Sequence, residues 1–245
     1  MKTCLMGCVL ASACQLCAMT SADAVSILLN SRNATSKRNF EMAQEMVAKD
    51  AENGKPLQQF VFAVTTDDAE LAKRYLNASR GKIQELAETK GNSLACYLLS
   101  MEKNDFGMLE KAVEGGNVQA FNALGTILIQ EALSHPGGAT NDLARLKRGF
   151  ELFGAAAAKR DPNGFVNLGT CYLHGYGCEP DPAMAFSSFS AAAEAGHPEG
   201  MDYLSSCYKY GRGIRKNDEL CLLWSMRARS ARGDESAEKW LRDRK

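Results

Sequence analysis

The feature that most constrains the fold is a turn-like dipeptide that recurs along the chain at a nearly fixed interval. Each copy pairs a glycine or an arginine with a second, polar residue, and a helix-like run follows it. The last three copies are spaced by 36 and 37 residues (160 to 196 and 196 to 233). Self-similarity at this period indicates stacked structural repeats. The copies are Gly54-Lys55, Gly91-Asn92, Gly116-Asn117, Arg160-Asp161, Gly196-His197 and Gly233-Asp234.

Two further positions repeat in register with these dipeptides. The fourth residue after each opening residue is small, except for Gln58, and the eighth is always large and apolar. Residues four apart share one face of a helix, so each copy predicts a helix that packs through a small residue beside a large one. The small residues are Ala95, Ala120, Gly164, Gly200 and Ala237, and the large ones are Phe62, Leu99, Leu124, Leu168, Leu204 and Leu241.

The last two full copies show the internal plan of a repeat. The first predicted helix of each ends in a glycine pair, Gly175-Tyr176-Gly177 or Gly211-Arg212-Gly213. Glycine just past a helix supplies the left-handed cap that other residues disfavour. A second helix is predicted over 182–195 and over 218–232, and the former opens with a proline, where the missing N–H costs little. Each repeat is therefore a helix, a turn and a second helix.

This combined pattern resembles the Sel-1-like repeat, a relative of the tetratricopeptide repeat. The resemblance implies an all-α fold, a right-handed α/α solenoid of stacked helix-turn-helix repeats, and a protein or peptide partner. One departure is Ser205, which stands where the repeat has glycine after its leucine. The matching residues are Leu168, Gly169, Tyr172, Gly175, Gly177, Asp181, Ala185, Ala192, Ala193 and Gly196.

The remaining segments are interpreted relative to these repeats. Residues 25–53 form a helical lead-in, with a helix expected over 37–52, and residues 54–116 are degenerate helical repeats. Residues 117–233 are the Sel-1-like repeats, with an expanded first copy. Residues 234–245 form a capping helix that keeps the packing residues and is charged elsewhere, as the end of a solenoid requires.

The first 24 residues have a different composition from the rest and are typical of a secretory signal peptide. Lys2 is the only charge before Asp23, an apolar stretch follows, and Ala22-Asp23-Ala24 offers a cleavage site. We therefore expect a periplasmic or secreted protein, cleaved after Ala24. An uncleaved anchor is the alternative. A lipoprotein is disfavoured, because Leu10 lies one place too far upstream of Cys14 for a lipoprotein box.

Cysteine usage argues against a metal site. Cleavage after Ala24 leaves an odd number of cysteines, and none are paired as Cys-x-x-Cys. With only three histidines in the chain, we expect no metal and no cofactor. If a disulfide forms in an oxidising compartment, Cys178 and Cys221 are the better placed pair. The cysteines are Cys96, Cys171, Cys178, Cys207 and Cys221.

The face of each first helix that points away from the packing residues is the candidate binding groove. Its amide, hydroxyl and tyrosine side chains can bond a peptide without a strong charge penalty. In related solenoids the first helices line the concave surface, so the resemblance implies that a peptide binds here; a plain solvated stripe is the alternative. The stripe consists of Asn163, Asn167, Thr170, His174, Glu199, Tyr203, Ser206 and Tyr210.

The charge balance disfavours a nucleic-acid partner. The chain has 29 basic and 29 acidic residues, so its net charge is zero. The end of the chain is more basic, with ten Lys or Arg against six Asp or Glu from Arg212 to Lys245. This excess predicts at most a weak contact with an anionic surface; a solvated face is the ordinary interpretation.

The sequence carries no pattern typical of an enzyme active site. It contains no phosphate loop, nucleophile elbow or paired zinc ligands. We therefore expect an exported, non-catalytic scaffold that binds a protein or a peptide. The alternative is a secreted Sel-1-like enzyme that acts on β-lactams or cell-wall material, for which Ser206 and Lys209 offer the Ser-x-x-Lys spacing.

Overall fold

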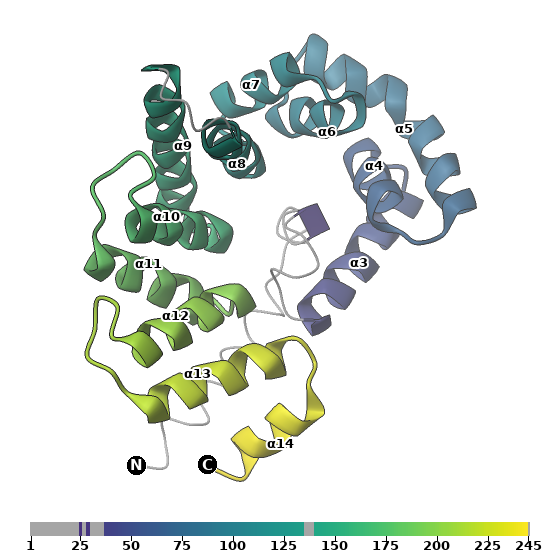
Figure 1. Ribbon diagram of the computed structural model, residues 1–245. Helices are drawn as coiled ribbons and strands as arrows, with labels where there is room; N and C mark the ends of the chain where they lie inside the picture. The colour runs from purple at the N-terminus through teal and green to yellow at the C-terminus, as the bar shows by residue number, and fades with distance from the viewer. Residues whose placement is uncertain (1–24, 26–27, 30–36, 135–139, 245) are drawn as a thin grey trace. The chain divides into compact units, whose positions relative to one another are not determined.

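The computed structural model describes residues 25, 28–29, 37–134 and 140–244. The predicted signal peptide, residues 1–24, lies outside these residues. The described part of the chain is helical and contains no strand, which confirms the predicted all-α class (Figure 1). None of its helices is both long enough and apolar enough to cross a membrane.

The helices follow the predicted plan closely. The helix expected over 37–52 is α3, and the second helices expected over 182–195 and 218–232 are α11 and α13, each one residue shorter than predicted. The full order is α3 (Lys37–Glu52), α4 (Pro56–Thr65), α5 (Ala69–Glu88), α6 (Ser93–Lys103), α7 (Phe106–Glu114), α8 (Val118–Ser134), α9 (Thr140–Ala158), α10 (Pro162–His174), α11 (Pro182–Glu194), α12 (Pro198–Tyr210), α13 (Asp218–Ala231) and α14 (Glu235–Arg242).

The chain forms two compact units that divide at Gly81, within α5. In the first unit, α3 and α4 bury Val47, Phe60 and Val61, and the rings of Phe62 and Tyr75 meet edge to face at 5.7 Å. The second unit contains the end of α5 and all helices from α6 to α14, and it holds the site described below.

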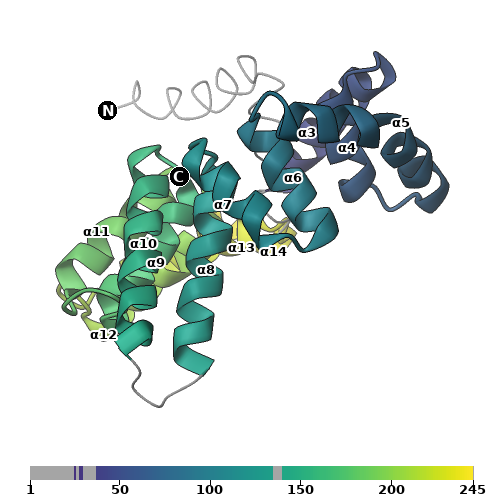
Figure 2. The ribbon, with the colours of Figure 1, turned by 90° about the horizontal axis from the view of Figure 1, so that it is seen from above.

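In the second unit each helix packs on its neighbour in the chain, as expected for a solenoid. Figures 1 and 2 both show α8 and α9 side by side, and the same pairing recurs for α10 with α11 and α12 with α13. The first helix α10 also contacts the first helices on either side of it, α8 and α12. We call the surface formed by α6, α8, α10 and α12 the first-helix face.

The backbone is left-handed at the opening residue of every repeat. The opening residues all have positive φ, from 58° at Gly91 to 89° at Gly233, and Arg160 takes this conformation at 60° without being glycine. Except for Lys55 before α4, the residue after the opener caps the next helix, because its side chain accepts the N–H of the fourth residue after the opener. The side chains with this role are Asn92, Asn117, Asp161, His197 and Asp234.

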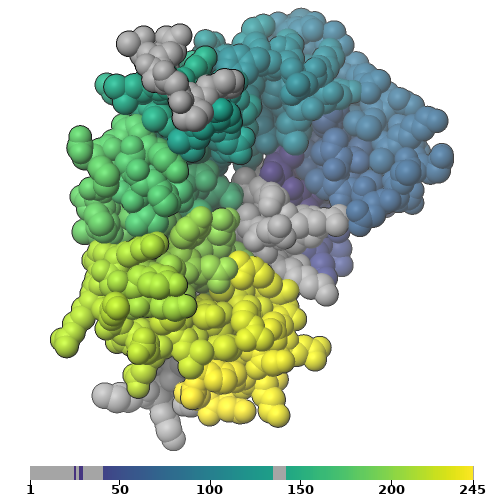
Figure 3. All heavy atoms as spheres, in the orientation of Figure 1, coloured from purple at the N-terminus to yellow at the C-terminus, as the bar shows by residue number. Residues whose placement is uncertain are grey.

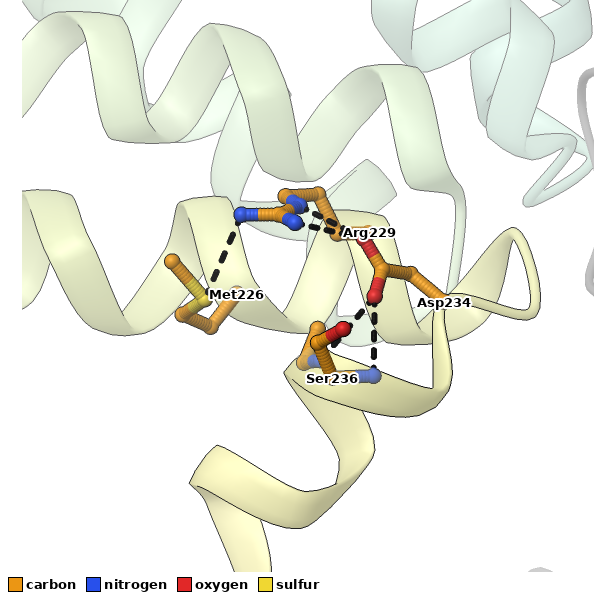
Figure 4. Close-up of polar contacts among 5 residues, drawn as sticks. Met226, Arg229, Asp234 and Ser236 are labelled. Carbon is orange, nitrogen blue, oxygen red and sulfur yellow. Dashed lines mark hydrogen bonds and ion pairs between the residues drawn. The ribbon is translucent and has the colours of Figure 1, made fainter.

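The cap of α14 is tied to the preceding helix (Figure 4). One carboxylate oxygen of Asp234 accepts from the Ser236 and Ala237 N–H groups, and the other accepts from Arg229 of α13. These bonds lower the pKa of Asp234, because they favour its charged form, with the Arg229 bond contributing most. The corner between α13 and α14 is therefore fixed by charge as well as by packing.

Packing between the two helices of a repeat explains why glycine follows leucine in the repeat. A side chain at Gly125 or Gly169 would meet the ring of Phe153 or Phe189 at about 2.6–2.7 Å, so each glycine makes room for the phenylalanine of its own second helix. The last repeat has no phenylalanine at that position. Ser205 fits there instead, and its hydroxyl donates to the carbonyl of Cys221 at 2.8 Å.

Candidate functional site

Some side chains of the predicted stripe are engaged in hydrogen bonds between neighbouring repeats. Asn122 of α8 donates to the Asp161 carboxylate at 2.8 Å, and Asn167 of α10 donates to Asn122 at 3.3 Å. The same Asp161 oxygen accepts the N–H of Gly164 as the cap of α10. Asn167 therefore helps to hold α8 and α10 together, and its amide is partly engaged within the protein.

His197 makes the equivalent link one repeat later. Its Nδ1 accepts the Gly200 N–H at 3.2 Å, so Nε2 carries the ring hydrogen and donates to the Asn163 side-chain oxygen at 3.1 Å. The residue is 2% exposed. Burial, with the positive charge of Arg232, lowers the pKa of His197 to about 4, so the ring is neutral at pH 7. Asn163, like Asn167, is bonded across repeats.

The other stripe residues differ widely in accessibility. Tyr203 is half-buried and stacks on Phe189 with ring centroids 4.6 Å apart, so it also packs the core. Tyr210 is 53% exposed at the end of α12. Glu199 and His174 are exposed, and the His174 ring stacks on Tyr176. The last two, Thr170 and Ser206, are half-buried, and the Thr170 hydroxyl donates to the Val166 carbonyl.

A hollow on the same face, two repeats earlier, was missed by the sequence analysis. It has a volume of about 550 Å³ and lies between α6, the start of α7, and α8. Met101 and Phe106, which line it, are 55% and 49% exposed although both are large and apolar. Repeat position could have found it, since Met101 stands ten residues after its opener, as Thr170 and Ser206 do. The lining residues are Tyr97, Ser100, Met101, Asn104, Asp105, Phe106, Leu109, Ala123, Ile127 and Glu131.

The cysteines of the described chain are free thiols, and burial lowers the reactivity of two of them. Burial raises the pKa of Cys171 to about 12, and it also raises the pKa of Cys207. The pair singled out for a disulfide, Cys178 and Cys221, is not bridged. Cys178 packs against the cluster of Ile129 and Phe153, whereas Cys221 lies against Ser205.

In the described chain, no serine hydroxyl of the Ser-x-x-Lys sites is hydrogen-bonded to its lysine. The ammonium of Lys209 lies 5.2 Å from the centre of the Tyr210 ring. The same spacing also occurs at Ser79, Ser100 and Ser236. The hydroxyls of Ser79 and Ser100 donate to backbone carbonyls within their own helices. Among the described residues, no three His, Cys, Asp or Glu side chains are grouped so that they could hold a metal ion.

Comparison with known proteins identifies the repeat. Residues 166–197 and 198–228 each match the Sel1 repeat. No match was found among curated proteins. The fold is similar to a Sel1 repeat protein from Oxalobacter formigenes, with 21% identity and a TM-score of 0.45 over 51% of this chain and 90% of that one. A Sel1 repeat protein from Klebsiella pneumoniae gives 20% identity and a TM-score of 0.45 over 82% and 99%.

A third structure is a protective antigen of uropathogenic Escherichia coli that displays an SLR fold. It is 18% identical, with a TM-score of 0.36 over 90% of this chain and 57% of that one, so the chain spans little more than half of the antigen's length. These similarities concern the fold. The repeat match coincides with the helix pairs α10–α11 and α12–α13, whose turns, caps and packing glycines were described above. The family match therefore identifies two Sel1 repeats within this chain, over residues 166–197 and 198–228.

Proposed function

We propose that this protein is a non-catalytic scaffold that binds a peptide segment of a protein partner on its first-helix face. Sel1 repeats are helical repeats suited to protein interaction, and that general role supports the proposal. The observation that carries it is the hollow between α6 and α8. Two large apolar side chains, Met101 and Phe106, are left about half exposed there, and such exposure is typical of binding surfaces.

The lining of the hollow indicates the chemistry of the peptide. Leu109 and Ile127 add apolar surface beside Met101 and Phe106, which favours aliphatic or aromatic side chains. Asp105 and Glu131 add two carboxylates, one of which caps α7 while the other pairs with Arg145 at 3.6 Å. We therefore expect a peptide with two apolar anchors and a neighbouring lysine or arginine.

The exposed stripe residues extend this surface toward the C-terminus of the chain. Repeat position places Asn167 and Tyr203 seven residues after their openers, as it places Ala123, which lines the hollow. In this proposal Glu199 and His174 contact more distant parts of the peptide. Tyr203 is a poor anchor for testing this, because its truncation would also unpack Phe189.

Peptide selection tests the proposal. A random peptide library displayed on phage is selected on the immobilised full chain, and enriched peptides are then titrated by fluorescence polarisation. The double variant Met101→Ala/Phe106→Ala should weaken binding at least tenfold, since aromatic and apolar anchors dominate such contacts. The matched control is Leu143→Ala/Met184→Ala, which truncates two other large apolar residues that are 69% and 45% exposed. If the wild-type chain and the Met101→Ala/Phe106→Ala variant bind the peptides equally, the peptide does not bind at the hollow between α6 and α8.

Two simple measurements test the remaining parts of the proposal. We propose that the protein is exported with cleavage after Ala24, and the intact mass of the exported protein checks this. We also propose that it lacks activity on β-lactams, which is supported by the engaged hydroxyls of Ser79 and Ser100 and by the raised pKa values of the buried thiols Cys171 and Cys207. Nitrocefin turnover or covalent labelling by a fluorescent penicillin would contradict the non-catalytic assignment.

A further inference from the structure

The turn between α12 and α13 carries a concentration of positive charge that its neighbours do not balance. Lys209, Arg212, Arg215 and Lys216 lie within eight residues, and no acidic residue occurs from Tyr203 to Asn217. All four are exposed, and none of them is in an ion pair of the described structure. The nearest carboxylates along the chain, those of Asp218 and Glu219, begin α13, where the helix dipole favours negative charge.

The preceding repeat shows that the turn does not need these charges. In both turns the backbone makes the same three bonds: Gly175, Tyr176 and Asp181 donate to carbonyls of α10, and Gly211, Arg212 and Asn217 donate to the equivalent carbonyls of α12. The paired glycines have nearly equal φ values, 75° and 74° against 69° and 72°. Glu179 and Pro180 stand at the positions of Arg215 and Lys216. The basic side chains are therefore an addition to a turn that forms without them.

The apolar residue of this turn also differs in its surroundings. In the preceding turn Cys178 is packed against the core cluster of Ile129 and Phe153. At the same position Ile214 is 38% exposed, directly before Arg215 and Lys216. Tyr210 is 53% exposed, and both Lys209 and Arg212 lie 5.2 Å from its ring centre. A tyrosine and an isoleucine are thus exposed to solvent on a turn that carries four basic side chains.

From this arrangement we infer that the turn from Lys209 to Lys216 is a contact site for an anionic phospholipid bilayer. Cations attract the surface of such a bilayer, and an exposed tyrosine and isoleucine can enter the headgroup boundary. The turn projects from the second unit as a convex loop, at the left in Figures 1 and 3. A convex loop can contact the flat surface of a bilayer, whereas an extended acidic peptide would need a groove. The site is separate from the hollow at α6–α8.

Vesicle flotation of the full chain tests this inference. The probes are vesicles of phosphatidylcholine alone and vesicles with 30% phosphatidylglycerol, at 100 mM and 500 mM NaCl. Each cation near an anionic surface contributes roughly fivefold to partitioning, so Arg212→Gln/Arg215→Gln/Lys216→Gln should weaken binding to the anionic vesicles on the order of 100-fold at low salt. Ile214→Ser should weaken it by a smaller factor that high salt does not remove.

The control variant Lys73→Gln/Arg74→Gln/Lys103→Gln removes the same charge from exposed positions elsewhere, and it should change partitioning by less than about threefold. All the chains carry residues 1–24, so differences between them report the loop. Equal losses in the two triple variants would overturn the site and leave only a general charge effect. Equal binding of the wild-type chain to phosphatidylcholine vesicles and to the anionic vesicles would also overturn the site. If 10 mM inorganic phosphate abolished binding at constant ionic strength, the turn would select a free anion, and the inference of a bilayer contact would be wrong.

Discussion

At the residue scale, the cap positions combine two roles that the sequence pattern alone does not separate. Asn117, Asp161 and His197 each accept the N–H of a residue three positions later and thereby start a first helix. Asp161 and His197 also bond to an asparagine of the neighbouring first helix. His197 is the only one of these caps whose ordinary pKa lies near neutral pH, and its bond from the Gly200 N–H requires an unprotonated Nδ1 and therefore the neutral ring.

His197 should therefore make the stability depend on pH. Its folded-state pKa of about 4 lies below the ordinary value of 6.5, so acid protonates the unfolded chain first. Stability is complete above pH 6.5 and falls as pH decreases toward 4, by about 2 kcal/mol between pH 6.5 and 5. Urea unfolding at several pH values measures this. His197→Asn keeps a capping oxygen, as Asn117 does, and should flatten the profile in this window. An unchanged slope in this variant would assign the pH dependence to other groups.

At the element scale, the turn glycines fall into two kinds that the sequence presents alike. Gly196 opens a repeat at φ 85° with open space around its α-carbon. Gly213 has φ 72°, and a β-carbon there would collide with the backbone carbonyl of Pro182, at the start of α11. Gly213 is therefore needed both for its backbone conformation and for the close approach of the α12–α13 turn to the previous repeat.

Alanine substitution should separate the two kinds. Gly196→Ala should cost about 1 kcal/mol of unfolding free energy, which is the usual penalty of a left-handed alanine. Gly213→Ala should cost more than about 3 kcal/mol, because the backbone collision adds to that penalty. Chemical denaturation of both variants measures the difference. Equal costs would show that the turn can move away from Pro182 without loss.

Sequence patterns predicted the helices and turns well because each depends on local rules. The positive φ of Gly175 and Gly211 and the ends of α11 and α13 follow from capping and spacing alone. The stripe was harder to predict, since periodicity gives the direction of a side chain but not its partner on the next repeat. Thus Asn163 and Tyr203 were both expected to point away from the packing residues, yet one bonds to His197 and the other stacks on Phe189. The hollow at α6–α8 requires the relative placement of three helices, which no local pattern specifies.

At the scale of the whole second unit, each helix packs mainly on its neighbours in the chain. The free energy of unfolding should therefore be close to a sum of contributions from single repeats and from the interfaces between neighbouring repeats. The last contact of the series is α14 on α13, where Ala237 is completely buried and Asp234 binds Arg229. If helices are coupled only to their neighbours, a loss of packing at α14 should destabilise α13 and α12 but leave α6–α8 unaffected. Binding at the hollow and contact through the α12–α13 turn would then be separable by mutation.

Deletion of residues 234–245 tests this coupling. The truncation exposes the face of α13 that Ala237 covers, so amide exchange should become at least tenfold faster in α13 and α12, while α6, α7 and α8 keep their protection. Hydrogen–deuterium exchange with mass spectrometry measures each helix separately. Removing only residues 243–245, which lie beyond α14, is the control and should leave α12 and α13 unchanged. If the longer deletion instead speeds exchange equally from α6 to α13, the second unit unfolds as one cooperative block, and mutations at the α12–α13 turn would also disturb the hollow.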